Sequence, residues 1–127
     1  MPTQTRIRGE VDFMRELYDQ LLHNYNFEIE TEPFAGDADL LVRNPMSGKT
    51  LVIELKDAGD YGELPISTII PISKLALQTN EFKKLLLITF SNVPVLLSKK
   101  LKELNVEALT KPTVNQVVEK IQLALSA

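Results

Sequence analysis

The sequence contains no cysteine and a single histidine, His23. Without cysteine the chain cannot form disulfides, use a thiolate nucleophile or bind zinc through sulfur. One histidine also argues against a catalytic triad and against a site with several histidine ligands. Any metal chemistry is therefore expected to rely on oxygen ligands.

Long apolar runs are absent as well. No apolar segment approaches the about 18 residues of a membrane-spanning helix, and residues 1–5 lack the apolar core of a signal peptide. A glycine-rich phosphate loop is also missing, which argues against a nucleotide-binding fold. We expect a cytoplasmic protein with neither a membrane partner nor an organic cofactor.

What is present is the composition of one soluble domain spanning residues 1–127, with 44% hydrophobic and 24% charged residues. The net charge of -3 conceals an uneven distribution. Residues 1–63 carry 6 basic and 13 acidic residues, whereas residues 64–127 carry 8 basic and 4 acidic ones. Because an acidic chain has no general attraction for phosphate, any nucleic-acid contact requires a local basic patch or a bound cation.

The hydrophobic periodicity predicts elements in the order α-β-β-β-α-β-α-β-α. Helices are predicted over residues 8–25, 66–79, 94–104 and 114–125, and strands over residues 27–32, 39–43, 50–56, 85–90 and 106–109. The turn at residues 44–49 joins two of the strands as an antiparallel hairpin. We therefore expect an α/β fold in which helices cover both faces of a mixed sheet, a three-layer α/β/α sandwich.

Local signals predict how three helices begin. Pro71 is expected to be the first residue of its helix, because proline is tolerated there. Ser91 or Asn92 is expected to cap the helix near Pro94. Thr113 and Gln116 have the spacing of a capping box at the start of the last helix.

Charged residues interrupt the apolar strand at residues 50–56. Glu54 and Lys56 are two residues apart, so both side chains point to the same face of the strand. Antiparallel pairing across the 44–49 turn brings Asp39 beside Glu54. The alternative is purely structural: Glu54 and Lys56 form an ion pair or meet solvent at a strand end, and Asp39 caps a turn.

Two carboxylates in one small volume repel each other unless a positive charge lies between them. With Asp39, Glu54 and the backbone carbonyl of Leu55 as ligands, the oxygen set suits Mg²⁺ or Mn²⁺. A water on such an ion could attack phosphorus, while Lys56 stabilises charge on the phosphate or orients the water. The residues therefore indicate hydrolysis of a phosphate ester.

This pattern resembles the PD-(D/E)XK nucleases, the restriction-endonuclease-like superfamily. The resemblance rests on Asp39, followed 15 residues later by Glu54-Leu55-Lys56, within the predicted order of helices and strands, and it covers about residues 6–110. Among these proteins the chain is most similar to archaeal-type Holliday junction resolvases, because Arg15-Glu16-Leu17 follows Gly9 in the first helix. Those resolvases are small and work as homodimers.

Two departures from the family pattern concern the site. Ala38 stands where the motif has proline, and Met14 stands where the resolvases place a metal-site glutamate. Glu10 lies one helical turn before Met14 and is the expected substitute. Asp37 is an alternative to Asp39.

The resemblance implies a magnesium-dependent endonuclease that cuts DNA, including branched DNA, and acts as a homodimer, with Asp39, Glu54, Lys56 and Glu10 as catalytic residues. The alternative is a catalytically inactive module of the same fold that binds nucleic acid or assembles with other proteins. Two lysine clusters either contact DNA phosphates or serve solubility. They comprise Lys83 and Lys84, and Lys99, Lys100 and Lys102.

Overall fold

The computed structural model describes residues 2–31, 39–58, 62–78 and 83–126, and for residues 2–11 and Lys83 it describes the backbone alone. The elements are α1 (Pro2–Asn24), β1 (Glu28–Thr31), β2 (Leu40–Arg43), β3 (Thr50–Leu55), the 3-10 turn η1 (Ile66–Thr68), α3 (Ile69–Gln78), β4 (Lys83–Thr89), α4 (Val95–Glu103), β5 (Val106–Thr110) and α5 (Val114–Leu125). The predicted order of helices and strands is confirmed.

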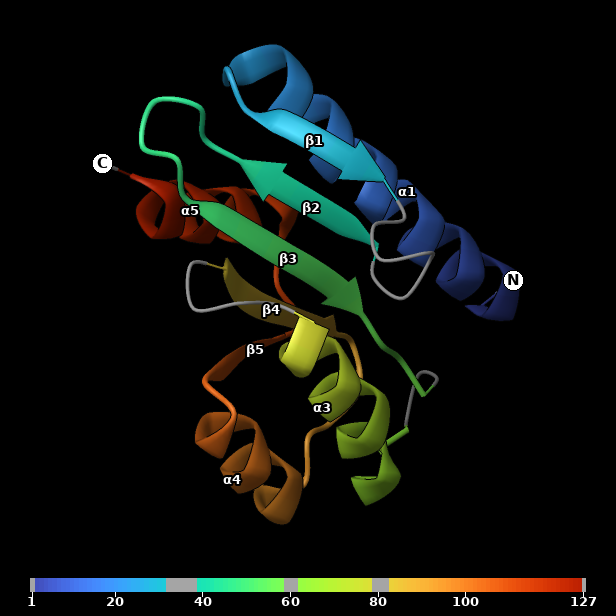
Figure 1. The fold of residues 1–127 in the computed structure, drawn as a ribbon. Coiled ribbons are helices and arrows are strands. Elements are labelled where there is room, and N and C mark those ends of the chain that lie inside the picture. The colour runs from blue at the N-terminus through green and yellow to red at the C-terminus, as the bar shows by residue number, and fades with distance from the viewer. Residues whose placement is uncertain (1, 32–38, 59–61, 79–82, 127) are drawn as a thin grey trace.

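One mixed sheet of five strands, in the order β1-β2-β3-β4-β5, forms the centre of the molecule (Figure 1). β1, β2 and β3 are successive antiparallel neighbours, and β4 and β5 continue the sheet parallel to β3. The hairpin predicted across residues 44–49 is confirmed by the pairing of Leu40 with Ile53 and of Arg43 with Thr50.

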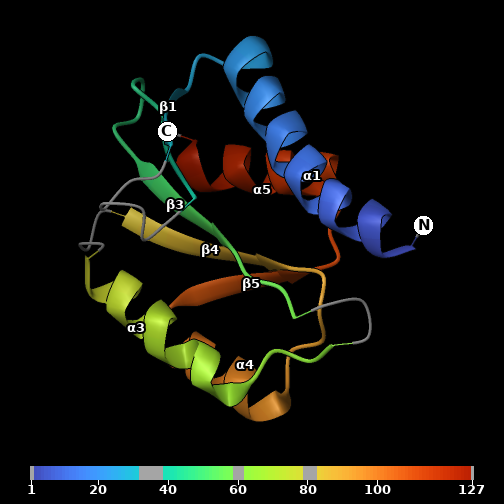
Figure 2. The same cartoon turned by 90° about the vertical axis from the view of Figure 1, so that its right-hand side faces the viewer.

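Helices cover both faces of the sheet, as expected for a three-layer sandwich (Figure 2). α1 and α5 lie on one face, where their apolar side chains pack with Leu51 and Ile53 of β3. α3 and α4 lie on the other face, where they pack with Val52. The alternation follows from the two-residue period of a strand, and it sends Glu54 to the same face as Val52.

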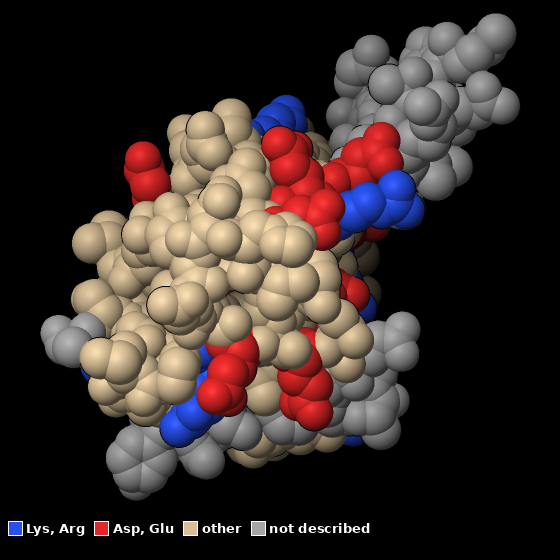
Figure 3. Space-filling view, turned by 90° about the horizontal axis from the view of Figure 1, so that it is seen from above, with Lys and Arg blue, Asp and Glu red and all other residues tan. Residues whose placement is uncertain are grey.

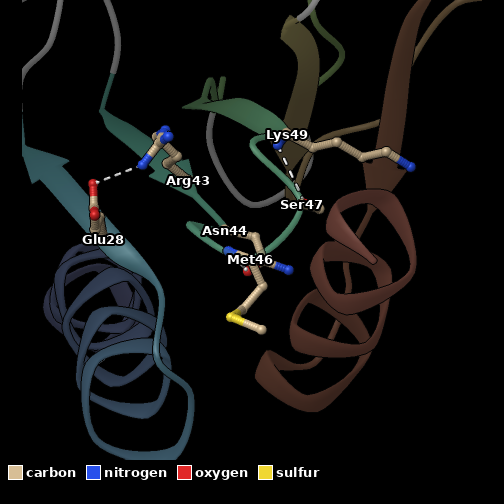
Figure 4. A network of polar contacts seen from close by, with 6 residues as sticks. All are labelled: Glu28, Arg43, Asn44, Met46, Ser47 and Lys49. Atoms are coloured by element: carbon tan, nitrogen blue, oxygen red, sulfur yellow. Dashed lines mark hydrogen bonds and ion pairs between the residues drawn. The ribbon is translucent and has the colours of Figure 1, made fainter. Parts of the chain in front are cut away.

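The β2–β3 turn, whose side chains Figure 4 shows from close by, is bonded to the end of α5. Asn44 Nδ2 and Ser47 Oγ donate hydrogen bonds to the Leu125 carbonyl at 2.8 and 2.7 Å. The same two side chains accept bonds from the backbone N–H groups of Met46 and Lys49. The turn thus satisfies a carbonyl that the helix end leaves without an intrahelical partner.

One of the three predicted helix starts is confirmed. The Thr113 hydroxyl accepts from the Gln116 N–H at 3.1 Å, and the Gln116 side chain accepts from the Thr113 N–H at 2.9 Å, which completes the capping box of α5.

The other two predictions are corrected. Pro71 is the third residue of α3, because η1 precedes the helix and the Ile66 carbonyl already accepts from the Ile69 N–H. Pro94, with no side-chain bond, occupies the N-cap of α4. Ser91 does not cap α4, since its hydroxyl bonds to the loop after β3 instead.

No helix in the described part of the chain is both long enough and apolar enough to cross a membrane.

Candidate active site

Asp39 and Glu54 lie side by side where β2 begins and β3 ends. The Asp39 N–H donates to the Ile53 carbonyl at 3.1 Å, which extends the β2–β3 ladder one step beyond the pairing of Leu40 with Ile53. Residues directly opposite each other in an antiparallel pair share a face, so the two acidic side chains meet. The structure therefore brings together the first two residues of the predicted motif.

At the next position of the β2–β3 ladder, the Asp39 side chain takes the place of a backbone hydrogen-bond acceptor. Its Oδ2 accepts a hydrogen bond from the Leu55 N–H at 2.7 Å. Because the N–H and C=O of one strand residue point to the same side, the Leu55 carbonyl is directed toward the edge at which β2 has begun. Two carboxylates and one backbone carbonyl thus share this corner of the sheet, as the sequence predicted.

The Glu54 side chain is buried, with 6% of its surface exposed. Burial raises the pKa of Glu54 from its ordinary value of 4.5 to about 8, and a hydrogen bond with Asp39 and the negative charge of Asp39 act in the same direction. The Lys56 ammonium and the Leu55 backbone lower the pKa by less. At neutral pH and without a cation, Glu54 therefore holds a proton that it shares with Asp39.

Lys56 follows Glu54 on the same side of the sheet. Its N–H donates to the Ile88 carbonyl at 3.0 Å, which continues the β3–β4 ladder past the last residue of β3. The side chain is half-buried, and its charge acts on the Glu54 carboxyl. The predicted trio of Asp39, Glu54 and Lys56 is therefore assembled in one place.

The loop after β3 is anchored to the loop after β4. The Ser91 hydroxyl donates to the Asp57 carboxylate and accepts from the Ala58 N–H at 2.7 Å. The backbone of Asn92 bonds to Gly62 at 3.1 Å and to Leu64 at 2.8 Å. These contacts restrain the segment that leaves Lys56.

Ser91 and Gly62 help to hold the loop that follows Lys56, and the sequence analysis assigned neither of them this role. Ser91 is buried, and a Cβ on Gly62 would lie 2.3 Å from the Ala58 carbonyl oxygen. A small polar residue directly after a buried strand is the signal for Ser91, and the same signal is typical of a helix cap. Nothing local in the sequence marks the close approach at Gly62.

Two further candidate acids cannot be placed with their side chains. Glu10 lies in α1, where residues 2–11 are described by their backbone alone, and Asp37 lies outside the described residues. Among the side chains that the structure does describe, no group of three or more histidine, cysteine, aspartate or glutamate residues is suited to hold a metal ion. A third carboxylate at the site stays a prediction.

Seen from above, the molecule carries acidic side chains spread over a mostly uncharged face, with basic side chains beside some of them (Figure 3). On α1 and β1 the exposed acidic residues are Asp12, Glu16, Asp19, Glu28 and Glu30. Glu28 pairs with Arg43 at 3.3 Å. Arg15 of α1 is exposed as well, so the described side chains of α1 and β1 carry both signs with acidic ones in excess.

The two lysine clusters lie at the other end of the sheet from Asp39 and Glu54. Lys84 is paired with Leu51, near the start of β3, whereas Glu54 is paired with Leu87. The lysines of α4 occupy its second half, which runs back toward the start of the parallel strands. The clusters therefore do not flank the site.

Comparison with known proteins identifies the fold. No family model and no curated protein matches the chain. The chain is similar to a solved structure of the MspJI restriction endonuclease in complex with a 27-mer oligonucleotide, with a TM-score of 0.51, 7% sequence identity, and coverage of 86% of this chain and 27% of that one. A repair endonuclease from Pyrococcus abyssi gives a TM-score of 0.49 at 19% identity, covering 80% of this chain and 47% of that one.

The chain thus spans about a quarter of the MspJI chain that it matches. The likeness to MspJI, together with the mixed sheet between two helical layers, shows a restriction-endonuclease-like fold.

Proposed function

We propose that this protein is a metal-dependent endonuclease that hydrolyses phosphodiester bonds in DNA. The observation that carries the proposal is the meeting of Asp39, Glu54 and Lys56 at one corner of the sheet. It is supported by the restriction-endonuclease-like fold in which that corner lies.

The acidic pair fits a divalent cation. Glu54 keeps a proton because burial and the neighbouring Asp39 carboxylate both disfavour its ionised form. A cation would replace that proton and allow both groups to be ionised. Asp39, Glu54 and the Leu55 carbonyl would hold it, and an all-oxygen set of this kind suits Mg²⁺ or Mn²⁺.

Each residue then has a role in hydrolysis. A bound divalent cation supplies Lewis acidity toward a water molecule and a phosphate oxygen. Lys56 places an ammonium group beside the carboxylates, where it stabilises negative charge on the phosphate. The bonds from Ser91 to Asp57 and Ala58 keep the segment after Lys56 in position. Glu10 is the proposed third acid.

DNA is the proposed substrate, and branched DNA is the finer version of the proposal. The likeness to an endonuclease solved with an oligonucleotide supports DNA in general. The strand ends of β3 and β4, where Asp39, Glu54 and Lys56 meet, are the proposed approach for a phosphate backbone. A homodimer is proposed because cutting two strands requires two sites and one chain contributes one.

Cleavage assays with Mg²⁺ or Mn²⁺ test the proposal on plasmid DNA, single strands and a four-way junction. The unmodified protein should cut at least one of them, and Lys56→Ala should reduce the rate about a hundredfold or more, since loss of one charge-stabilising donor has that scale. Lys49→Ala is the matched control, because Lys49 is an exposed lysine of the β2–β3 turn. It should cut as the parent does.

Calorimetric titration with Mn²⁺ separates the enzyme from an inactive module of the same fold. Binding that is lost in Asp39→Asn supports a metal-dependent enzyme. If Mn²⁺ does not bind and no substrate is cut, the proposal is wrong and the chain is a binding or assembly module.

A further inference from the structure

β5 forms one edge of the sheet. Among the described residues no strand pairs with its outer side. The Lys111 N–H donates to the Thr89 carbonyl of β4 at 2.7 Å, and successive residues of a strand point their backbone groups to opposite sides. Val106, Ala108 and Thr110 therefore direct their N–H and C=O groups away from the sheet, as a template for another strand.

A cavity of about 970 Å³ lies at the start of the parallel strands, where it reaches from Lys84 of β4 to the first half of β5. Its walls come from both helical layers, because α4 and α5 lie on opposite sides of β5 (Figure 2). The α4 wall contributes Ser98, Leu101 and Lys102, and the α5 wall contributes Lys120, Leu123 and Ala124. Val106, Glu107 and Ala108 of β5 form part of its lining. The space is thus bordered by the starts of β4 and β5 and by two helices, and it opens beside the edge strand.

The cavity is basic and partly apolar. Lys84, Lys102 and Lys120 line it, and Glu107 is the one carboxylate among the described lining residues. Glu107 is already paired with Lys120 at 2.6 Å. Leu104 and Leu123 line the same space with 36% and 75% of their surface exposed. A ligand with carboxylates and apolar side chains matches these walls.

We propose that this groove binds an extended acidic peptide segment of a partner protein, which adds to β5 as a sixth strand. The edge of β5 offers N–H donors and C=O acceptors alternately. A peptide backbone carries both kinds of group and can pair with this edge, whereas a phosphate backbone carries acceptors alone and cannot. Acidic side chains of the peptide would meet Lys84 and Lys102. The site is independent of the acidic pair at the other end of β3.

A second copy of this chain is a poorer occupant. Antiparallel pairing of β5 with β5 would put the start of one strand, with its lysine-lined cavity, beside the end of the other, where the exposed Lys111 follows, so that like charges would face each other. Pairing the acidic edge of β1 with β5 would join copies head to tail, and such a contact continues into open chains of molecules.

Fluorescence anisotropy with a labelled peptide of about eight alternating valine and glutamate residues tests the site. The peptide should bind, and raising the salt concentration should weaken it. Two methylated forms of the peptide serve as controls, one with N-methyl groups on the odd residues and one with N-methyl groups on the even residues. Both keep the charge but lose the N–H donors of the methylated residues. At least one of the two methylated forms should not bind.

Variants locate the binding on the protein. Lys84→Glu combined with Lys102→Glu should weaken the peptide about tenfold or more, since two favourable charge pairs become unfavourable. Lys99→Glu is the matched control, an exposed lysine of α4 that does not line the cavity, and should bind as the parent does. Ala108→Pro removes an outward N–H that no β4 carbonyl uses, so it should abolish binding while circular dichroism stays unchanged.

Three results would overturn the proposal. The first is equal binding of both methylated peptides and the parent peptide, which would mean that charge alone attracts the ligand. The second is a short oligothymidylate that displaces the peptide and is itself weakened by the double charge reversal, which would make the groove a nucleic-acid surface. The third is assembly of the chain alone into larger species that Ala108→Pro abolishes.

Discussion

At the scale of single residues, the acidic pair is the least ordinary feature of the molecule. A carboxyl group as buried as that of Glu54 is seldom kept without a compensating partner. Here the partner is a second carboxylate, so the pair holds a proton that a solvent-exposed glutamate would lose. The acidic pair therefore favours binding of a proton or a cation. This preference should make the free energy of unfolding depend on pH.

The first prediction concerns Glu54→Gln in EDTA. The pKa of Glu54 is about 8 in the folded chain and near 4.5 when the chain is unfolded, so between these values the folded state binds more protons and its stability falls as the pH rises. The side-chain amide introduced by Glu54→Gln is neutral at every pH, so the variant does not lose stability in this way as the pH rises. Relative to the parent, the variant should gain a few kcal/mol in the free energy of unfolding between pH 5 and pH 8.

Urea unfolding at several pH values measures this difference. Glu30→Gln, on the exposed edge strand β1, is the control and should follow the parent at every pH. A constant difference between Glu54→Gln and the parent across the range would show that Glu54 is ionised in the folded protein.

At the scale of elements, the connection between the hairpin and the last helix holds together segments far apart in sequence. Asn44 and Ser47 both donate to the Leu125 carbonyl (Figure 4 shows the turn). α5 in turn packs on the face of the sheet that carries Leu51 and Ile53. The orientation of β3 is therefore supported at its beginning by the turn and at its end by the pairing with Asp39.

The second prediction is that Asn44→Ala combined with Ser47→Ala lowers the free energy of unfolding by about 2 kcal/mol. The Leu125 carbonyl loses both donors, and the turn loses two bonds to its own backbone. Hydrogen exchange should speed up in the last turn of α5 and stay unchanged in β4. Lys49→Ala, in the same turn, should leave both measurements as they are, and unchanged exchange in the double variant would contradict the prediction.

At the scale of the whole molecule, the candidate site and the basic groove lie at opposite ends of the parallel strands. Asp39, Glu54 and Lys56 gather where β3 ends, whereas the cavity lies beside the start of β4 and β5. The exposed acidic residues occupy a third region, on α1 and β1. The described part of the chain thus presents three surfaces of different charge, each suited to a different contact.

The third prediction is that the protein is a homodimer in solution. Light scattering at micromolar concentration should give twice the chain mass of 14.3 kDa. The reason is functional, since two strands of DNA need two sites, and the contact surface must lie away from the acidic pair. A monomer at this concentration would argue against cutting both strands together but would still permit nicking.

Much of the architecture was predictable because it depends on short-range patterns. The alternation in β3 and the 44–49 turn were sufficient to predict the hairpin and to put Asp39 opposite Glu54. Helix starts were less predictable, because η1 and the competing bonds of Ser91 involve contacts that periodicity does not record. The hydrogen bond from the Leu55 N–H to Asp39 and the close approach of Gly62 to Ala58 are likewise contacts that sequence periodicity does not predict.

By itself, the sequence determined the order of elements, the face on which each strand residue lies, and the three polar residues that the hairpin brings together. These depend on periods of two and 3.6 residues and on one turn, all of which act locally along the chain. Only the tertiary structure decided that Glu54 is buried enough to hold its proton, that the lysine clusters lie at the far end of the sheet, and that β5 is left as an edge between two helices. The burial of a side chain and the exposure of a sheet edge depend on how the elements pack against one another. Residues that are distant in sequence determine that packing jointly.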